Sequence, residues 1–332
     1  MNIAPLVRSL TELDRHPPHV NSSPERDAAF AGIAQFLESQ IRSGQPFDLK
    51  TVHPNPLWLL FEDRLQAALT RWTAQSAPPD HVRIHQWYNS GVVWEADGLR
   101  LGFDLVPMRR LYQWEDRHDL TGQLADWLDV LLITHRHEDH YDADLVRACL
   151  ERDKPVYMPA ALARTWKPAA GLVAVADGDQ WSIGAWTLHA QTGIHIWRET
   201  PEQVPLIIYT AISPAGGAWV YGGDVDYTQM PAPPDPAPVQ AFFVPWRSPN
   251  ARYEDGDARQ EGTLLDALHR LIDQWKPAML FYEHCAELEH VYDGFPASFD
   301  MALESKHRLA VASELMFWGE WMDRPARCDA CG

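Results

Sequence analysis

Residues 130–142, Val-Leu-Leu-Ile-Thr-His-Arg-His-Glu-Asp-His-Tyr-Asp, decide the fold of this chain. An apolar run ends at Ile133, and side chains of the types that bind metals follow it directly. A buried strand that ends there would deliver them to a loop at its carboxyl end, where open α/β sheets hold their functional sites. The sequence therefore predicts a metal site directly behind this strand.

The spacing within this stretch predicts two ions. His135 and His137 are two residues apart, so in an extended segment their side chains point the same way and can bind one ion. Asp139 and His140 follow after the chain has begun to turn, so they can face a second ion beside the first. Imidazole with carboxylate suits zinc, and manganese and iron are also compatible. We therefore expect two divalent metal ions, with Zn²⁺ favoured.

The stretch resembles the His-x-His-x-Asp-His signature of the metallo-β-lactamase superfamily. The resemblance covers residues 82–288 and implies three further ligands, each at the end of a strand. His195 comes shortly after the strand-like residues 185–190, Asp224 follows an apolar run that ends in two glycines, and His284 ends another apolar run. All three expected ligands thus have candidates, in the expected order.

The resemblance also implies a fold and an activity. The fold would be α/β, a four-layer αββα metallo-β-lactamase sandwich. One metal would be held by His135, His137 and His195, the other by Asp139, His140 and His284, and Asp224 would bridge them. The activity would be that of a binuclear hydrolase, in which a metal-bridging hydroxide attacks the substrate and Asp139 accepts its proton.

The residues after His140 narrow the resemblance. Tyr141-Asp142 is similar to the branch that contains ascorbate-phosphate lactonases and the phospholipase D acting on N-acyl phosphatidylethanolamine, as is the run 242–249. We expect a small, anionic lactone, ester or phosphodiester as substrate. The alternatives are a phosphodiesterase or nuclease of the same fold, and a non-hydrolytic iron-dependent oxidoreductase or metal-retaining binding protein. His137 argues against the redox alternative, because flavodiiron-type relatives carry an acid there.

Two Trp-Arg pairs are candidate substrate contacts. Each pair lies just beyond a predicted strand end, and they are Trp197 with Arg198 and Trp246 with Arg247. The arginines would bind a carboxylate or phosphate. The alternative is a packed tryptophan beside a surface arginine.

Composition restricts the partners. The 332 residues carry a net charge of −18, which disfavours nucleic acid as a substrate. No apolar stretch approaches the ~20 residues of a membrane span, and the first residues lack the features of a signal peptide. The four cysteines are scattered and form no disulfide framework, which predicts a cytoplasmic protein. Cys328 and Cys331 are interpreted as part of a frayed tail rather than as a redox pair or half a zinc site.

Three regions are expected. Residues 1–80 form an N-terminal helical extension, residues 81–322 the catalytic domain and residues 323–332 a C-terminal tail. In the extension, helices that begin at Pro24 and Pro56 would form a hairpin, which either packs on the main domain or supplies a homo-oligomer interface. A last helix is expected over about 298–321.

Overall fold

Two seven-stranded sheets form the centre of the molecule. The computed structural model describes residues 2–18, 23–42, 56–107, 116–195, 203–226, 229–234, 237–245, 257–285 and 299–327. In spatial order, the first sheet contains β14 (Trp321–Pro325), β1 (His81–Gln86), β2 (Val92–Ala96), β3 (Leu99–Phe103), β4 (Val130–Leu132), β5 (Val156–Pro159) and β6 (Leu172–Val175). The second contains β13 (Ala312–Leu315), β12 (Met279–Glu283), β11 (Val239–Pro245), β10 (Ala218–Tyr221), β9 (Leu206–Ile212), β8 (Trp186–Gly193) and β7 (Gln180–Ile183).

The direction of the strands places the functional loops. Strands β3 to β6 run parallel to one another, and so do β10 to β13. Strand β9 is antiparallel to both β8 and β10, so β8, β10 and β12 all run the same way. Their carboxyl ends therefore lie at one edge of the second sheet, where the loops that follow them meet.

Aromatic side chains fill the space between the sheets. The ring centroid of Trp94 of β2 lies 4.2 Å from that of Phe103 in the same sheet. It lies 5.3 Å from that of Phe243 in the other sheet. Trp219 and Tyr221 face this inner core, whereas Ala218 and Val220, which alternate with them along β10, belong to the cluster on the outer side. This alternation follows from the period of two in a strand, and it fixes which residues of β10 face the first sheet.

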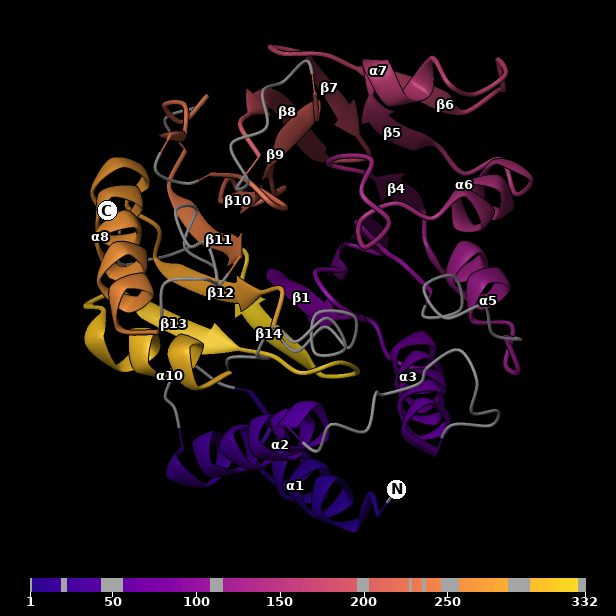
Figure 1. The fold of residues 1–332 in the computed structure, drawn as a ribbon. Helices are drawn as coiled ribbons and strands as arrows, with labels where there is room; N and C mark the ends of the chain where they lie inside the picture. Colours follow the sequence, from indigo (N-terminus) through magenta and orange to yellow (C-terminus); the bar gives the residue numbers. More distant parts are fainter. Residues whose placement is uncertain are drawn as a thin grey trace.

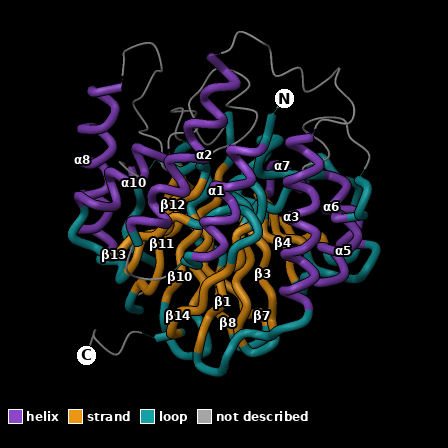
Figure 2. The backbone as a smooth tube through the Cα atoms, turned by 90° about the horizontal axis from the view of Figure 1, so that it is seen from below, coloured by secondary structure: helices purple, strands orange, loops and turns teal. Residues whose placement is uncertain are grey.

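Helices cover both outer faces. α3 (Pro56–Thr73), α5 (Leu120–Trp127) and α6 (Ala143–Leu150) lie on the side of the first sheet, near the short helix α7 (Ala160–Ala163). α8 (Asp257–Trp275) and α10 (Phe299–Arg308) lie on the side of the second (Figure 1). The strands form the centre between these helices in the second view (Figure 2). The expected four-layer αββα sandwich is thereby confirmed.

The N-terminal helices depart from the expectation. Besides α2 (Pro24–Arg42) and α3, the structure contains α1 (Ala4–Arg15), which buries Leu6, Leu10 and Leu13 along one stripe. α2 packs against α1 and α10, and α3 packs against α5, so the expected pairing of α2 with α3 is replaced by these contacts. The apolar side chains of all three helices join the same buried cluster as the sheet residues. This region therefore completes the main core.

The C-terminal region also differs from the expectation. The helix predicted over 298–321 ends at Arg308, and β13 and β14 follow it. β14 pairs with β1 from His81↔Pro325 to His85↔Trp321, so the boundary expected between residues 322 and 323 falls inside a strand. The helical spacing of apolar residues is overridden because this segment extends both sheets by one edge strand. In the described part of the chain, no helix is long and apolar enough to cross a membrane.

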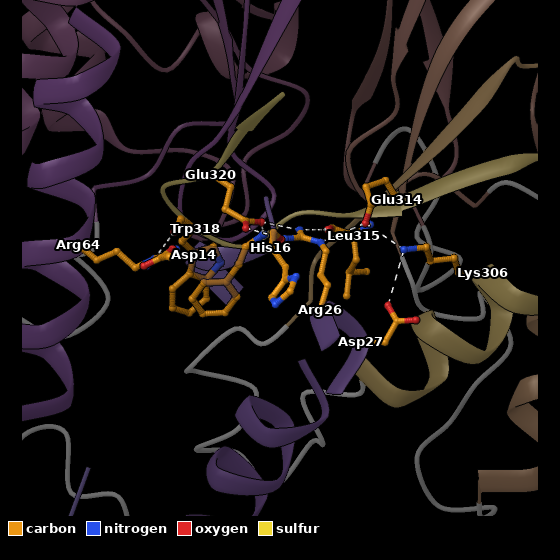
Figure 3. A network of polar contacts seen from close by, with 11 residues as sticks. Asp14, His16, Arg26, Asp27, Arg64, Lys306, Glu314, Leu315, Trp318 and Glu320 are labelled. Atoms are coloured by element: carbon orange, nitrogen blue, oxygen red, sulfur yellow. Dashed lines mark hydrogen bonds and ion pairs between the residues drawn. The ribbon is translucent and has the colours of Figure 1, made fainter. Parts of the chain in front are cut away.

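A buried ionic network attaches α2 to this C-terminal segment (Figure 3). The fully buried Arg26 donates hydrogen bonds to both carboxylate oxygens of Glu320 at 2.7 Å and to the carbonyl oxygen of Leu315 at 2.6 Å. Lys306 of α10 lies 3.0 Å from Glu314 in the same network. The network therefore joins α2 and α10 to the segment that passes from one sheet to the other.

Candidate metal centre

The loop after β4 carries four candidate ligands. β4 lies between β3 and β5, and the backbone N–H of Ile133 still donates to Tyr157 at 2.9 Å. The loop then turns, because the backbone N–H groups of His140 and Tyr141 both donate to the carbonyl oxygen of His137. Asp142 ends the loop by capping α6, where its side chain accepts from two backbone N–H groups at 2.8 Å.

The other three candidates come from the second sheet. His195 follows β8, Asp224 follows β10 after two glycines, and His284 follows β12 directly. Gly223 has a φ of +51°, and a Cβ on it would lie 2.5 Å from Oγ1 of Thr134. Only a glycine allows this approach, which brings Asp224 against the loop of the first sheet.

The structure brings all seven candidates together in two groups. Within each group, one ligand atom per residue lies within 4.8 Å of the others. The first group is His135, His137, His195 and Asp224, and the second is Asp139, His140, Asp224 and His284. This division is the one that the superfamily resemblance implies.

Asp224 lies between the two groups. Its Oδ2 is 3.4 Å from Nε2 of His195 in the first group. Its Oδ1 is 2.9 Å from Nε2 of His284 in the second. Oδ2 also lies 3.6 Å from Nε2 of His140, so the carboxylate of Asp224 contacts members of both groups and is shared between them.

The donor set fits divalent transition metals. Nε2 of His140 and Nε2 of His284 lie 2.7 Å apart, with Oδ2 of Asp139 3.8 Å from each. Nε2 of His135 is buried and has no hydrogen-bond partner among the described residues. Convergent imidazole nitrogens with carboxylates are the ligands of zinc, and also of iron or manganese. A buried nitrogen of this kind is satisfied when it binds a cation.

Asp104 orients the cluster, and the sequence analysis missed it. It lies just after β3, is fully buried and accepts hydrogen bonds from the backbone and side chain of Thr134 at 2.7 and 2.5 Å. Its Oδ2 is also 2.7 Å from Nδ1 of His140. A carboxylate on one ring nitrogen directs the other nitrogen toward a metal. The available signal was an acid within the apolar run 99–106.

A second supporting loop lies between β1 and β2. The amide of Asn89 donates to the carbonyl oxygen of Asp139 at 3.0 Å. Oγ of Ser90 lies 3.3 Å from Nδ1 of His140. This loop therefore holds the backbone of one candidate ligand and the ring of another.

Burial keeps most of the imidazoles neutral. It lowers the pKa of His135 well below the usual range and that of His284 to about 4. Burial also lowers the pKa of His137, assisted by the charge of His195. Since a neutral imidazole is the form that binds metals, these three rings are prepared for ligation.

The carboxylates of the centre stay ionised or become neutral according to their neighbours. Burial raises the pKa of Asp224, but His284 and His140 together lower it well below the usual range. Burial opposes the protonation of His140, but Asp139 and the other carboxylates raise its pKa well above the usual range. Burial, together with the charges of Asp104 and Asp224, raises the pKa of Glu283 well above the usual range, although His140 opposes this.

The remaining candidates cannot be placed. Residues 197, 198, 246 and 247, the two Trp-Arg pairs, lie outside the described residues. The same holds for Cys328 and Cys331. The substrate contacts expected from the sequence therefore stay predictions.

Comparisons with known proteins identify the fold. No protein-family model matches this chain, and no curated protein matches it. Among solved structures, it resembles Igni18, a metallohydrolase from the archaeon Ignicoccus hospitalis, with a TM-score of 0.54 and 15% identity over 74% of this chain and 98% of that one. It also resembles the isothiocyanate hydrolase from Delia radicum gut bacteria, with a TM-score of 0.52 and 14% identity over 74% and 99% of the two chains. For the metallo-β-lactamase fold protein YhfI from Bacillus subtilis, the TM-score is 0.50 and the identity 15% over 74% and 100%. The chain has the metallo-β-lactamase fold.

Proposed function

We propose that this chain is a metal-dependent hydrolase with a binuclear centre. The observation that carries the proposal is the position of Asp224, whose carboxylate belongs to both groups of ligands and contacts histidines of each. His135, His137 and His195 would hold one ion, and Asp139, His140 and His284 the other. Two divalent cations so held would activate water near neutral pH and polarise the bond to be cleaved.

The chain's own residues orient the ligands and move a proton. Asp104 fixes the ring of His140, and Asn89 fixes the backbone of Asp139. Asp139 is more exposed than the other carboxylate, at 22% against 7% for the side chain of Asp224. Oδ2 of Asp139 lies 3.8 Å from Nε2 of both His140 and His284. Because it is the more exposed of these two carboxylates, Asp139 would accept the proton from water.

We propose a small, anionic lactone, ester or phosphodiester as the substrate. The net charge of −18 opposes a nucleic acid, which must lie along a surface, whereas one carboxylate or phosphate can be neutralised inside the centre. Asp142, which suggested the lactonase and phospholipase D branch, caps α6. Because capping the helix accounts for this aspartate, the main support for a small anionic substrate is the net charge, and not the resemblance to that branch.

Metal analysis and a substrate panel test the proposal together. The purified protein should contain, or take up, about two divalent ions per chain, and it should hydrolyse a small anionic substrate better than single-stranded RNA or DNA. Asp224→Ala should lose most of the metal and activity. Asp126→Ala, at an aspartate 69% exposed on the outer helix α5, should lose neither. Wild-type protein that takes up no transition metal, or an Asp224→Ala variant with normal turnover, would contradict it.

A further inference from the structure

A cavity of about 890 Å³ lies between α1, α3 and β14. Its walls include Leu60, Ala67 and Arg71 of α3, and Trp321 of β14. None of the seven residues of the metal centre lines it. Its volume is in the range of pockets that bind small molecules.

The acidic residues of this cavity already have basic partners. Their contacts are Asp14 with Arg64 at 2.7 Å, Asp63 with Arg117 at 2.6 Å, Glu320 with Arg26 at 2.7 Å, and Asp323 with Arg83 at 2.7 Å. The first and third of these contacts are drawn in Figure 3. Since the negative charges are compensated, the arginines that remain determine the charge of the cavity.

Of the arginines that line the cavity, Arg64 is paired with Asp14, whereas the exposed Arg71 has no acidic partner within 4.0 Å in the described part of the chain. Its guanidinium donates to the carbonyl oxygen of Gly319 at 3.3 Å, a long contact to a neutral group. Partial burial and the charge of Arg64 lower its pKa, while Asp14 offsets part of this. No neighbouring carboxylate in that part of the chain pairs with this guanidinium, so an anion beside Arg71 would accept a charge-assisted hydrogen bond from it.

Part of the wall is apolar. It includes Leu60 and Ala67 of α3 and Trp321 of β14, whereas the side chain of Met322 packs in the core between the sheets. The guanidinium of Arg83 lies 4.0 Å from the ring centroid of Trp321 and holds the indole in place. A ligand with a charged head and an apolar body would therefore find both of its surfaces matched.

We propose that this cavity binds a small organic anion, with its carboxylate or phosphate on Arg71 and its apolar body against α3 and β14. It is a second ligand site, separate from the metal centre. The shared chemistry is one anionic head on an aryl or branched alkyl body.

The test measures binding by calorimetry to the full chain after removal of metals with a chelator, because anions also bind metal ions. The probes are benzoate and phenyl phosphate. Two control probes are incomplete: benzyl alcohol lacks the anionic head, and inorganic phosphate lacks the apolar body. One of the two anionic aryl probes should bind better than both incomplete probes. Arg71→Ala should weaken this binding about tenfold or more, because a charge-assisted hydrogen bond is lost.

Two further variants distinguish binding in the cavity from nonspecific attraction of anions to surface arginines. Arg164→Ala removes an exposed arginine directly after α7, outside the cavity, and should leave binding unchanged. Ala67→Phe fills the cavity at an exposed helix position without changing the charge, and it should abolish binding while the protein stays folded. The proposal is overturned if neither aryl anion binds at millimolar concentration. It is equally overturned if Arg71→Ala or Ala67→Phe binds as the wild type does.

Discussion

Replacing Arg26 by methionine should destabilise the protein strongly. The guanidinium is fully buried and makes two 2.7 Å hydrogen bonds to Glu320, whose side chain is 5% exposed. It also donates to the carbonyl oxygens of Leu315 and His16 at 2.6 and 2.9 Å. Methionine fills a similar volume but leaves Glu320 charged, buried and without its partner. Removal of one member of a buried ion pair costs about 3–5 kcal/mol, a large share of the ~5–15 kcal/mol that stabilises a domain.

Urea unfolding followed by circular dichroism measures this loss. Arg15→Met on α1 is the matched control, because Arg15 is 68% exposed and its partner Glu12 is 40% exposed. That variant should unfold at the wild-type midpoint, since exposed pairs contribute little. The double variant Arg26→Met with Glu320→Met should recover part of the loss, because the unpaired carboxylate of Glu320 is then removed, while Glu314 keeps Lys306 as its partner. If Arg26→Met unfolds at the same midpoint as Arg15→Met, the network does not stabilise the fold and the reasoning is refuted.

Three further predictions concern the centre and the core. Asp104→Asn should weaken metal binding about 10- to 100-fold in chelator competition, because His140 loses its orienting carboxylate, whereas Asp126→Asn should not. Gly223→Ala should lower both metal affinity and the free energy of unfolding, by at least about 1 kcal/mol for the latter, since it combines a left-handed backbone with contact on Thr134. Gly216→Ala is the control, because Gly216 has a φ of +86° and nothing lies within 4 Å of a Cβ on it. This variant should lose stability through its backbone conformation but keep its metal affinity. Equal metal affinities for the two variants would contradict the close approach of Gly223 to Thr134. Burial raises the pKa of the Cys149 thiol to about 12. Iodoacetamide at pH 7.5 should therefore alkylate Cys149 in the unfolded protein but not in the native protein, as measured by peptide mass spectrometry.

The sequence predicts the layers of the fold because its buried strands are continuous apolar runs with clear ends. β4, β10 and β12 are all of this kind, and each ends where a candidate ligand begins. The C-terminal segment was predicted wrongly as a helix, because the apolar residues of 309–318 also fit a helical period. Glu314 shows why the strand is formed, since its fully buried carboxylate contacts Arg26 and Lys306 from two helices. Such long-range ion pairs leave no local pattern in the sequence.

The candidate ligands are visible in the sequence, but the residues that hold them are not. His135 to His140 form a compact motif, whereas Asp104 is one acid at the end of a strand that is otherwise unremarkable in composition. Asn89 and Ser90 read as an ordinary turn between two strands, and their contacts with Asp139 and His140 depend on the pairing of the whole first sheet. A supporting residue acts through one hydrogen bond across the fold, so spacing along the chain does not reveal it.

The distant ends of the chain meet beneath the metal centre, and this explains why the N-terminal helices belong to the main core. Arg26 holds Glu320, whose backbone carbonyl accepts from the backbone N–H of Gln86 at 3.0 Å. The side chain of Gln86 donates to the carbonyl oxygen of Asn89 at 2.9 Å, and Asn89 donates to Asp139 at 3.0 Å. A continuous series of contacts therefore runs from α2 through the residue before β14 and the end of β1 to a candidate ligand. Because three of these four contacts join segments far apart in the sequence, the backbone of the ligand loop is tied to α2 and to the segment before β14 by the tertiary fold alone.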